Sequence, residues 1–121
     1  MNKYHNRKVT TTDGIVHDSR KEAVRWNELK LLEKAGKIHE LRRQMEFLLI
    51  PPQYEEITTG KRGKKPKKKL LERGVVYRAD FVYHDEKGEI IVEDTKGYKT
   101  KDYIIKRKLL LWVFGIRIRE V

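Results

Sequence analysis

The chain has 121 residues, a length that predicts one domain, and it carries a formal net charge of +11 with no cysteine. The lack of cysteine excludes disulfides and thiolate metal sites, and no apolar run approaches the roughly 20 residues that a membrane span requires. A small, strongly basic protein most often binds nucleic acid, and an anionic membrane surface is the next candidate.

Residues 1–18 are polar, and no apolar segment follows the basic start of the chain, so the sequence predicts no secretory signal. Together with the lack of cysteine, this indicates a cytoplasmic protein. Asp13 and Gly14 are a turn signal. We expect the two histidines of this stretch, His5 and His17, at the surface, because neither has a partner at the spacing of a metal site.

A helix is predicted to begin after Ser19, because Ser19 and Glu22 form a capping box with the serine as N-cap. It should end at Gly36, which suits the left-handed position after a helix. Arg20 and Lys21 lie in its first turn, where the helix dipole disfavours cations. They indicate either a site that faces an anion or an ordinary solvated surface. The apolar residues at helical spacing are Ala23, Val24, Trp26, Leu31, Leu32 and Ala35.

Residues 44–50 are predicted to form a strand after a turn at 38–41, and Pro51 and Pro52 end it because proline cannot donate to a ladder. Residues 54–73 are expected to be a mobile loop, because a dense block of like charges repels itself. The loop is either a solvated tip or a flap that contacts phosphates, and the basic chain favours the second. Its candidate contacts are Lys61, Arg62, Lys64, Lys65, Lys67, Lys68 and Lys69.

Residues 74–84 and 89–96 alternate as two strands joined by a turn with glycine at its last position. Asp94 and Lys96 point to one side of the second strand, and antiparallel pairing should let Asp80 share that side. Glu93 is the competing acid, but its side chain should leave the opposite face, so we prefer Asp94. One face of the first strand should carry Val75, Tyr77, Ala79, Phe81 and Tyr83.

A second helix is predicted over residues 101–114, with Thr100 as N-cap and Gly115 at its end. Residues 116–121 should form a strand, and a strand–helix–strand succession predicts a right-handed parallel crossover. The order αβββαβ therefore predicts an α/β (α+β) fold, with a mixed sheet flanked by helices, in a single domain over residues 1–121. The helix should bury Ile105, Leu109, Trp112 and Val113, and expose Lys101, Lys106, Arg107 and Lys108.

Two carboxylates and a lysine on neighbouring strands are what a Mg²⁺-dependent phosphodiesterase requires. Asp80 and Asp94 are ligands of the kind that Mg²⁺ or Mn²⁺ takes, and the backbone carbonyl of Thr95 would supply another. Lys96 would orient and activate the attacking water and offset phosphate charge. Glu22 would complete the acidic cluster, although its capping role explains it equally well. The plain alternative is an Asp–Lys ion pair across the hairpin.

Asp80 followed by Asp94-Thr95-Lys96 resembles the PD-(D/E)xK nuclease motif, and the predicted element order is similar to the restriction-endonuclease-like core of that superfamily. More narrowly, the chain resembles a group of small phage and prophage proteins, the DUF1064 group, described as endonuclease-like. Ala79 stands where the motif usually has proline. The segments that carry the resemblance are 18–23, 29–36, 77–81, 92–97 and 100–111.

The resemblance implies metal-ligand roles for Asp80 and Asp94, water activation by Lys96 and a helix acid at Glu22. It implies more weakly a role for Gln44, which matches a glutamine that related nucleases often place near the active site. It also implies a phage or prophage origin, with action inside a bacterial host cell.

We therefore expect a metal-dependent DNA endonuclease that binds the backbone through its basic loop and second helix. The sequence does not select a DNA structure; a junction resolvase would act as a two-fold homodimer. The alternative is a nucleic-acid-binding accessory protein that kept the fold without catalysis, and the intact set of Asp80, Asp94 and Lys96 argues against it. A third hypothesis is an inhibitor that presents the basic surface to another protein.

Overall fold

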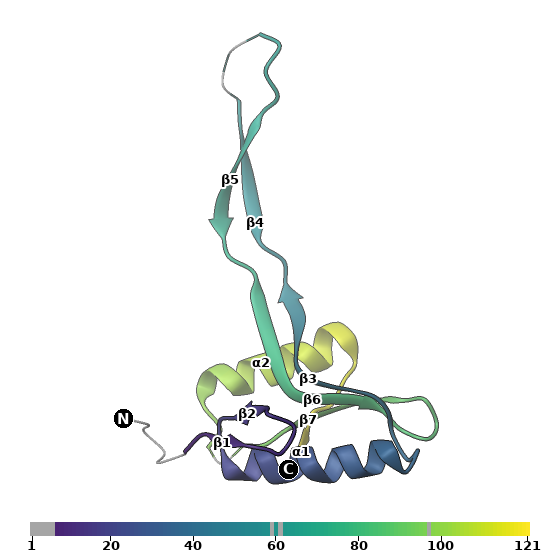
Figure 1. Ribbon diagram of the computed structural model, residues 1–121. Coiled ribbons are helices and arrows are strands. Elements are labelled where there is room, and N and C mark those ends of the chain that lie inside the picture. Colours follow the sequence, from purple (N-terminus) through teal and green to yellow (C-terminus); the bar gives the residue numbers. More distant parts are fainter. Residues whose placement is uncertain (1–6, 59, 61, 97) are drawn as a thin grey trace.

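The computed structural model describes residues 7–58, 60, 62–96 and 98–121, and it has an α+β fold (Figure 1). The predicted αβββαβ order is confirmed, with two small ribbons added to it. The core elements are α1 (Arg20–Lys34), β3 (His39–Ile50), β6 (Val75–His84), β7 (Ile90–Asp94), α2 (Lys101–Phe114) and β8 (Arg119–Glu120). The ribbons are β1 (Val9–Thr10) with β2 (Val16–His17), and β4 (Gln53–Ile57) with β5 (Lys67–Glu72).

The main sheet has the strand order β3-β6-β7-β8, in which only the β7–β8 pair is parallel, as the predicted crossover requires. The two helices lie on opposite faces of this sheet (Figure 1). On the α1 side the buried core is Trp26, Leu29, Ile38, Phe81 and Tyr83. On the α2 side it is Phe47, Leu49, Tyr77, Ala79, Val82, Val92, Tyr103 and Leu110. In the part of the chain that the structure describes, neither helix is long and apolar enough to cross a membrane.

The two core clusters show that β6 changes faces near Asp80. Tyr77 and Ala79 pack on the α2 side, whereas Phe81, two residues further, packs on the α1 side. The prediction of one unbroken alternation along this strand is therefore wrong. The cause lies on β3, where Gln44, opposite Asp80 in the register, has a left-handed φ of 55° that interrupts the extended backbone. A non-glycine residue in that conformation costs on the order of 1 kcal/mol, and such strain is often found at functional sites.

The start of β3 corrects the turn predicted at residues 38–41, because the strand already begins at His39. A register shift between His39 and Arg42, with a φ of 55° at Glu40, makes a β-bulge there. A bulge bends a strand without ending its pairing. The chain therefore bends at this point, but it does so through a bulge within a paired strand and not through a turn before the strand.

The helix ends lie where the capping residues predict them. The Oγ of Ser19 accepts a hydrogen bond from the backbone N–H of Glu22 at 3.1 Å, and the Oγ1 of Thr100 accepts one from Tyr103 at 3.1 Å. Gly115, with φ 69°, ends α2 in the left-handed conformation. These local signals fix both helices independently of their packing.

The predicted buried stripe of α2 is wrong for three of its four residues, and only Leu109 of them packs against the core. Tyr103 and Leu110 face the sheet, whereas Ile105 is 58% exposed and Trp112 87% exposed. Apolar residues occupy several sides of this helix, so their spacing alone did not decide which side packs.

Strands β4 and β5 form an antiparallel ribbon that projects from the body as an arm (Figure 1). The prediction of a loop is therefore wrong for the two strands. Self-repulsion of the basic block was expected to prevent structure, but the register places Glu55 opposite Lys69 and Glu56 opposite Lys68. Opposite charges across a strand pair stabilise it. Lys67, opposite Ile57 at the far end of the paired strands, has no acid across from it.

The arm joins the body at a crowded point beside Gly74. A Cβ there would lie 3.0 Å from the carbonyl oxygen of Ile50 and 3.2 Å from the Cδ of Pro52, so a side chain at this position would require both neighbours to shift. Ile50 and Val75 are paired across the ladder at this point. The pairing of β3 with β6 therefore extends to the base of the arm.

Asp13 fastens the β1–β2 ribbon to α1. One carboxylate oxygen accepts hydrogen bonds from the Thr11 hydroxyl and, at 3.1 Å, from the N–H of Ile15. The other accepts from the indole N–H of Trp26 at 2.6 Å. These hydrogen bonds, chiefly those of Thr11 and Trp26, lower the pKa of Asp13 from 3.8 to about 2.

We expect ionised Asp13 to stabilise the fold above about pH 4, and this contribution to be lost as the pH falls toward about 2. The sign follows because the pKa is lower in the folded than in the unfolded chain. Melting temperatures of wild type and Asp13→Asn between about pH 6 and pH 2 measure the effect. The wild type should melt higher at the upper end, and the difference should shrink with acidification; a constant difference would refute the prediction.

Candidate active site

Asp80, Asp94 and Lys96 come together where β6 and β7 lie side by side. The Nζ of Lys96 lies 3.3 Å from Oδ2 of Asp94. Asp80 accepts hydrogen bonds at Oδ2 from both the backbone N–H and the hydroxyl of Thr95, each 2.8 Å long. The structure therefore places the three residues of the predicted motif in one site at the end of β7.

Asp94 is fully buried, which is unusual for a carboxylate. Its Oδ2 accepts a hydrogen bond from the Tyr77 hydroxyl at 2.6 Å, and its Oδ1 has no partner among the described residues. Burial, followed by a hydrogen bond with Asp80 and the charge of Asp80, raises the pKa of Asp94. A buried carboxylate beside a second carboxylate, with one oxygen unpaired, can take a positive charge in addition to that of Lys96.

Glu22 approaches the same cluster from the first turn of α1. Its Oε1 accepts a hydrogen bond from Nε2 of Gln44 at 3.2 Å and lies 3.7 Å from Nδ1 of His17. Burial, with the negative charges of Asp80 and Asp18, raises its pKa to about 7. The predicted Glu22 and Gln44 thus contact each other, and the strained backbone of Gln44 brings its amide there.

Glu93 lies on the other face of β7, as the strand phasing predicts. Its two carboxylate oxygens accept hydrogen bonds from Nε and Nη2 of Arg25, both 2.7 Å long, and it also accepts one from the Tyr83 hydroxyl. Glu93 is fully buried in this network. Its role is to hold α1 against the sheet, which leaves Asp94 as the acid beside Lys96.

The acidic residues fit a hard divalent cation in part. Across the described ranges, no three acidic or histidine side chains stand close enough together to hold a metal ion, so Asp80, Asp94 and Glu22 do not form a three-carboxylate site in this arrangement. Mg²⁺ keeps several waters and is commonly held by one or two carboxylates. Asp80 and Asp94 suit that mode, because Oδ1 of Asp94 has no hydrogen-bond partner among the described residues. Thr95, predicted as a carbonyl ligand, orients Asp80 through its N–H and hydroxyl.

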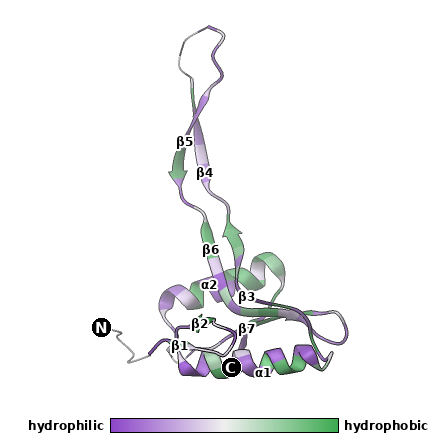
Figure 2. Ribbon diagram, in the orientation of Figure 1, coloured by the Kyte–Doolittle hydropathy of each residue, from purple (hydrophilic) through white to green (hydrophobic). Residues whose placement is uncertain are grey.

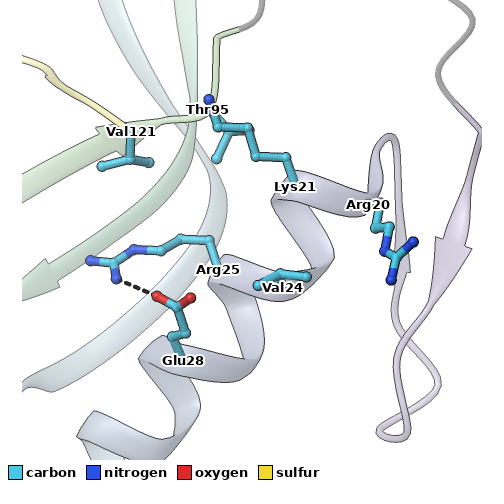
Figure 3. Close-up of a pocket in the computed structure, with 7 residues that line it drawn as sticks. All are labelled: Arg20, Lys21, Val24, Arg25, Glu28, Thr95 and Val121. Carbon is cyan, nitrogen blue, oxygen red and sulfur yellow. Dashed lines mark hydrogen bonds and ion pairs between the residues drawn. The ribbon is translucent and has the colours of Figure 1, made fainter.

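A pocket of about 370 Å³ opens beside this cluster, between the first turns of α1 and the ends of β7 and β8 (Figure 3). Lys21 extends along it toward Thr95, while Arg20 points away toward the β1–β2 ribbon (Figure 3). Arg25 lies deeper and is engaged with Glu28 and Glu93. Of the two cations in the first turn of α1, Lys21 is therefore the one directed toward the site, and the anion-facing interpretation of the helix start stays a prediction.

The predicted nucleic-acid contacts divide into free and paired cations. On α2, Lys106 pairs with Asp102 at 3.3 Å and Arg107 with Glu120 at 3.0 Å, whereas the exposed Lys101 and Lys108 show no ion pair to any described residue. On the arm, Lys61 lies outside the described residues. The arm's remaining cations, all exposed, are Arg62, Lys64, Lys65, Lys67, Lys68 and Lys69.

Three residues of the site were not predicted. His17, expected at the surface, is fully buried between Glu22 and Thr11, and burial with the charge of Arg43 lowers its pKa. Tyr77 holds Asp94, and the ring of Tyr103 lies 4.7 Å from Nζ of Lys96. No local signal in the sequence showed which polar group each of the three would meet. His5 lies outside the described residues.

The family model described as "Protein of unknown function (DUF1064)" matches residues 1–120 of the chain. The match covers both helices, all strands of the main sheet and the arm. No curated protein and no solved structure gives a significant match.

Proposed function

The chain belongs to the DUF1064 family, as predicted, and the description of that family gives no function. We propose that the chain is a metal-dependent nuclease of the PD-(D/E)xK type that hydrolyses phosphodiester bonds in DNA. The observation that carries the proposal is the buried Asp94, which lies next to Asp80 and 3.3 Å from Lys96. Its Oδ1 has no hydrogen-bond partner among the described residues. A fully buried carboxylate beside a second carboxylate and a lysine is costly to keep without a purpose.

Asp80 and Asp94 would hold the divalent cation. When bound, such an ion polarises a phosphoryl oxygen and lowers the pKa of a coordinated water. Thr95 fixes Asp80 through two hydrogen bonds, and Tyr77 fixes Asp94 through one, so both carboxylates are oriented in advance.

Lys96 would act on the attacking water and on the phosphate charge. Its Nζ is held between Asp94, at 3.3 Å, and the ring of Tyr103, at 4.7 Å. An ammonium in that position donates hydrogen bonds to a water beside the carboxylates and stabilises negative charge that develops on the phosphate. Lys21, in the adjoining pocket, supplies a second positive charge for the nucleic-acid backbone.

The test is cleavage of plasmid and branched DNA with Mg²⁺ or Mn²⁺ by wild type, Asp80→Asn and Asp94→Asn. Because metal-ion stabilisation is worth several kcal/mol, each variant should lose roughly 10³-fold in rate. Asp102→Asn is the matched control, since Asp102 is an exposed aspartate paired only with Lys106. It should cleave like the wild type. Mn²⁺ binding, measured by calorimetry, should be lost in Asp94→Asn and kept in the control.

Tight DNA binding by the wild type without cleavage under any divalent metal would overturn the proposal. That outcome would favour the alternative, a nucleic-acid-binding accessory protein with a nuclease-like fold.

A further inference from the structure

The β4–β5 arm has two parts: a stem in which acidic residues lie opposite basic ones, and a tip whose charged residues are all basic. In the stem, the register sets Glu55 against Lys69 and Glu56 against Lys68. Beyond it, Arg62, Lys64 and Lys65 are exposed and form no ion pair with a described residue, and residues 58–66 contain no acid. Positive charge is therefore concentrated at the end of the arm that lies farthest from the body (Figure 1).

The arm has no structural role in the body. Every described residue of β4 and β5 is exposed, and neither core cluster contains a residue from the ribbon. Figure 2 shows it as largely hydrophilic, with apolar residues near its base, where Leu70 and Leu71 lie. An exposed two-stranded ribbon without its own core is marginal in isolation, so contact with a partner would stabilise it.

The shape and charge of the arm fit a nucleic-acid duplex. The major groove of a B-form duplex, about 12 Å wide, admits a two-stranded ribbon. Lysine and arginine at the tip would meet phosphates on both sides of that groove, where each neutralised phosphate releases counterions. An apolar protein groove or a bilayer core would instead select for apolar residues at the tip, and residues 62–66 there are Arg, Gly, Lys, Lys and Pro.

The arm is also continuous along the chain with the strands that carry the candidate active site. β3 and β6, which carry Gln44 and Asp80, continue through Pro51 and Gly74 into β4 and β5. At about 3.3 Å per strand residue, the chain from Asp80 to Lys67 spans at most roughly 43 Å. One turn of a B-form duplex is about 34–36 Å. The tip can therefore reach a groove about one helical turn from a phosphodiester bound at Asp80.

We propose that the β4–β5 arm inserts into a groove of duplex DNA about one helical turn from the bond that the active site binds. The substrate is thus a duplex with at least one turn of double helix flanking the reacting phosphodiester. This inference rests on the proposed nuclease function only for the position of the reacting bond. Binding of duplex by the arm does not depend on catalysis.

The experiment measures equilibrium binding in EDTA, where no cleavage occurs, to duplexes of about 8 and 24 base pairs over a range of salt concentrations. Wild type is compared with the tip variant Arg62→Gln/Lys64→Gln/Lys65→Gln. The charge-matched control is Lys34→Gln/Lys37→Gln/Lys87→Gln, three exposed lysines at the far end of α1 and in the β6–β7 turn.

Wild type should bind the longer duplex at least about tenfold more tightly than the shorter one. The tip variant should lose this preference, and the slope of log affinity against log salt should fall by about 2 to 3, close to 0.9 per lost contact. The control should keep the preference for length. Circular dichroism and melting temperatures will show whether each variant is folded.

Equal losses in the tip variant and the control would overturn the inference, because net charge alone would then explain the binding. Tighter binding to a single strand of the same length would also overturn it, as would a tip-dependent affinity for anionic vesicles in place of duplex. A wild type that binds duplex through the tip but cleaves nothing with Mg²⁺ would refute the nuclease proposal and support this one.

Discussion

Replacing Lys96 by glutamine should reduce DNA cleavage about 10³-fold while leaving metal and DNA binding nearly intact. The ammonium lies 3.3 Å from Asp94 and over the ring of Tyr103, where a neutral amide cannot supply charge to the attacking water or the phosphate. Loss of one acid–base or charge-stabilising group typically costs 10²–10⁴ in rate. Single-turnover cleavage rates, with Mn²⁺ binding measured alongside, will separate chemistry from binding.

Lys99→Gln is the matched control for this prediction. Lys99 is three residues away, half-exposed, and pairs with Glu120 at 2.9 Å rather than with the acidic cluster. Its replacement removes the same charge from the same region and should change the rate less than about threefold, since an exposed pair contributes little. Similar losses in both variants would mean that Lys96 acts through general electrostatics, and no loss in Lys96→Gln would remove it from the site.

Replacing Arg25 by methionine should lower the free energy of unfolding by about 3–5 kcal/mol, a large part of the stability of a domain this size. The change leaves Glu93 fully buried with its two 2.7 Å hydrogen bonds to the guanidinium gone. The pairing also raises the pKa of Arg25, chiefly through the hydrogen bonds to Glu93. Urea denaturation of wild type and variant measures the loss.

Two further variants separate this buried pair from ordinary surface electrostatics. Glu28→Gln removes the other carboxylate partner of Arg25, which is 54% exposed, and should cost no more than about 1 kcal/mol. Arg25→Met/Glu93→Leu removes the buried carboxylate together with its partly exposed partner and should recover much of the loss, because apolar replacements of such pairs are often tolerated. A single Arg25→Met variant that is as stable as Glu28→Gln would contradict the prediction.

The helices and the motif could be predicted because their signals are local. Ser19, Thr100 and Gly115 fix helix ends through hydrogen bonds to neighbours in the sequence. The two-residue period of β7 likewise separates Asp94 from Glu93. In each case the information lies within a few residues of the feature.

The remaining features depend on partners that are distant in the sequence. The change of face at Asp80 follows from the backbone of Gln44 on another strand, and the order of the arm follows from Glu55 and Glu56 opposite the lysines. The burial of His17 depends on Glu22 and on the ribbon that Asp13 fastens to α1. A pattern in one segment cannot show such pairings before the register is known.

The pairing of Ile50 with Val75 makes the arm a module that can be removed from the architecture. The backbone of β3 and β6 is already in ladder contact at that point, so a two-residue β-turn would join the strands if residues 51–74 were absent. None of the residues in either core cluster comes from that stretch. Natural or engineered chains of this architecture can therefore lengthen, shorten or exchange the arm as an insertion, and the packing of the remaining domain sets no limit on its size.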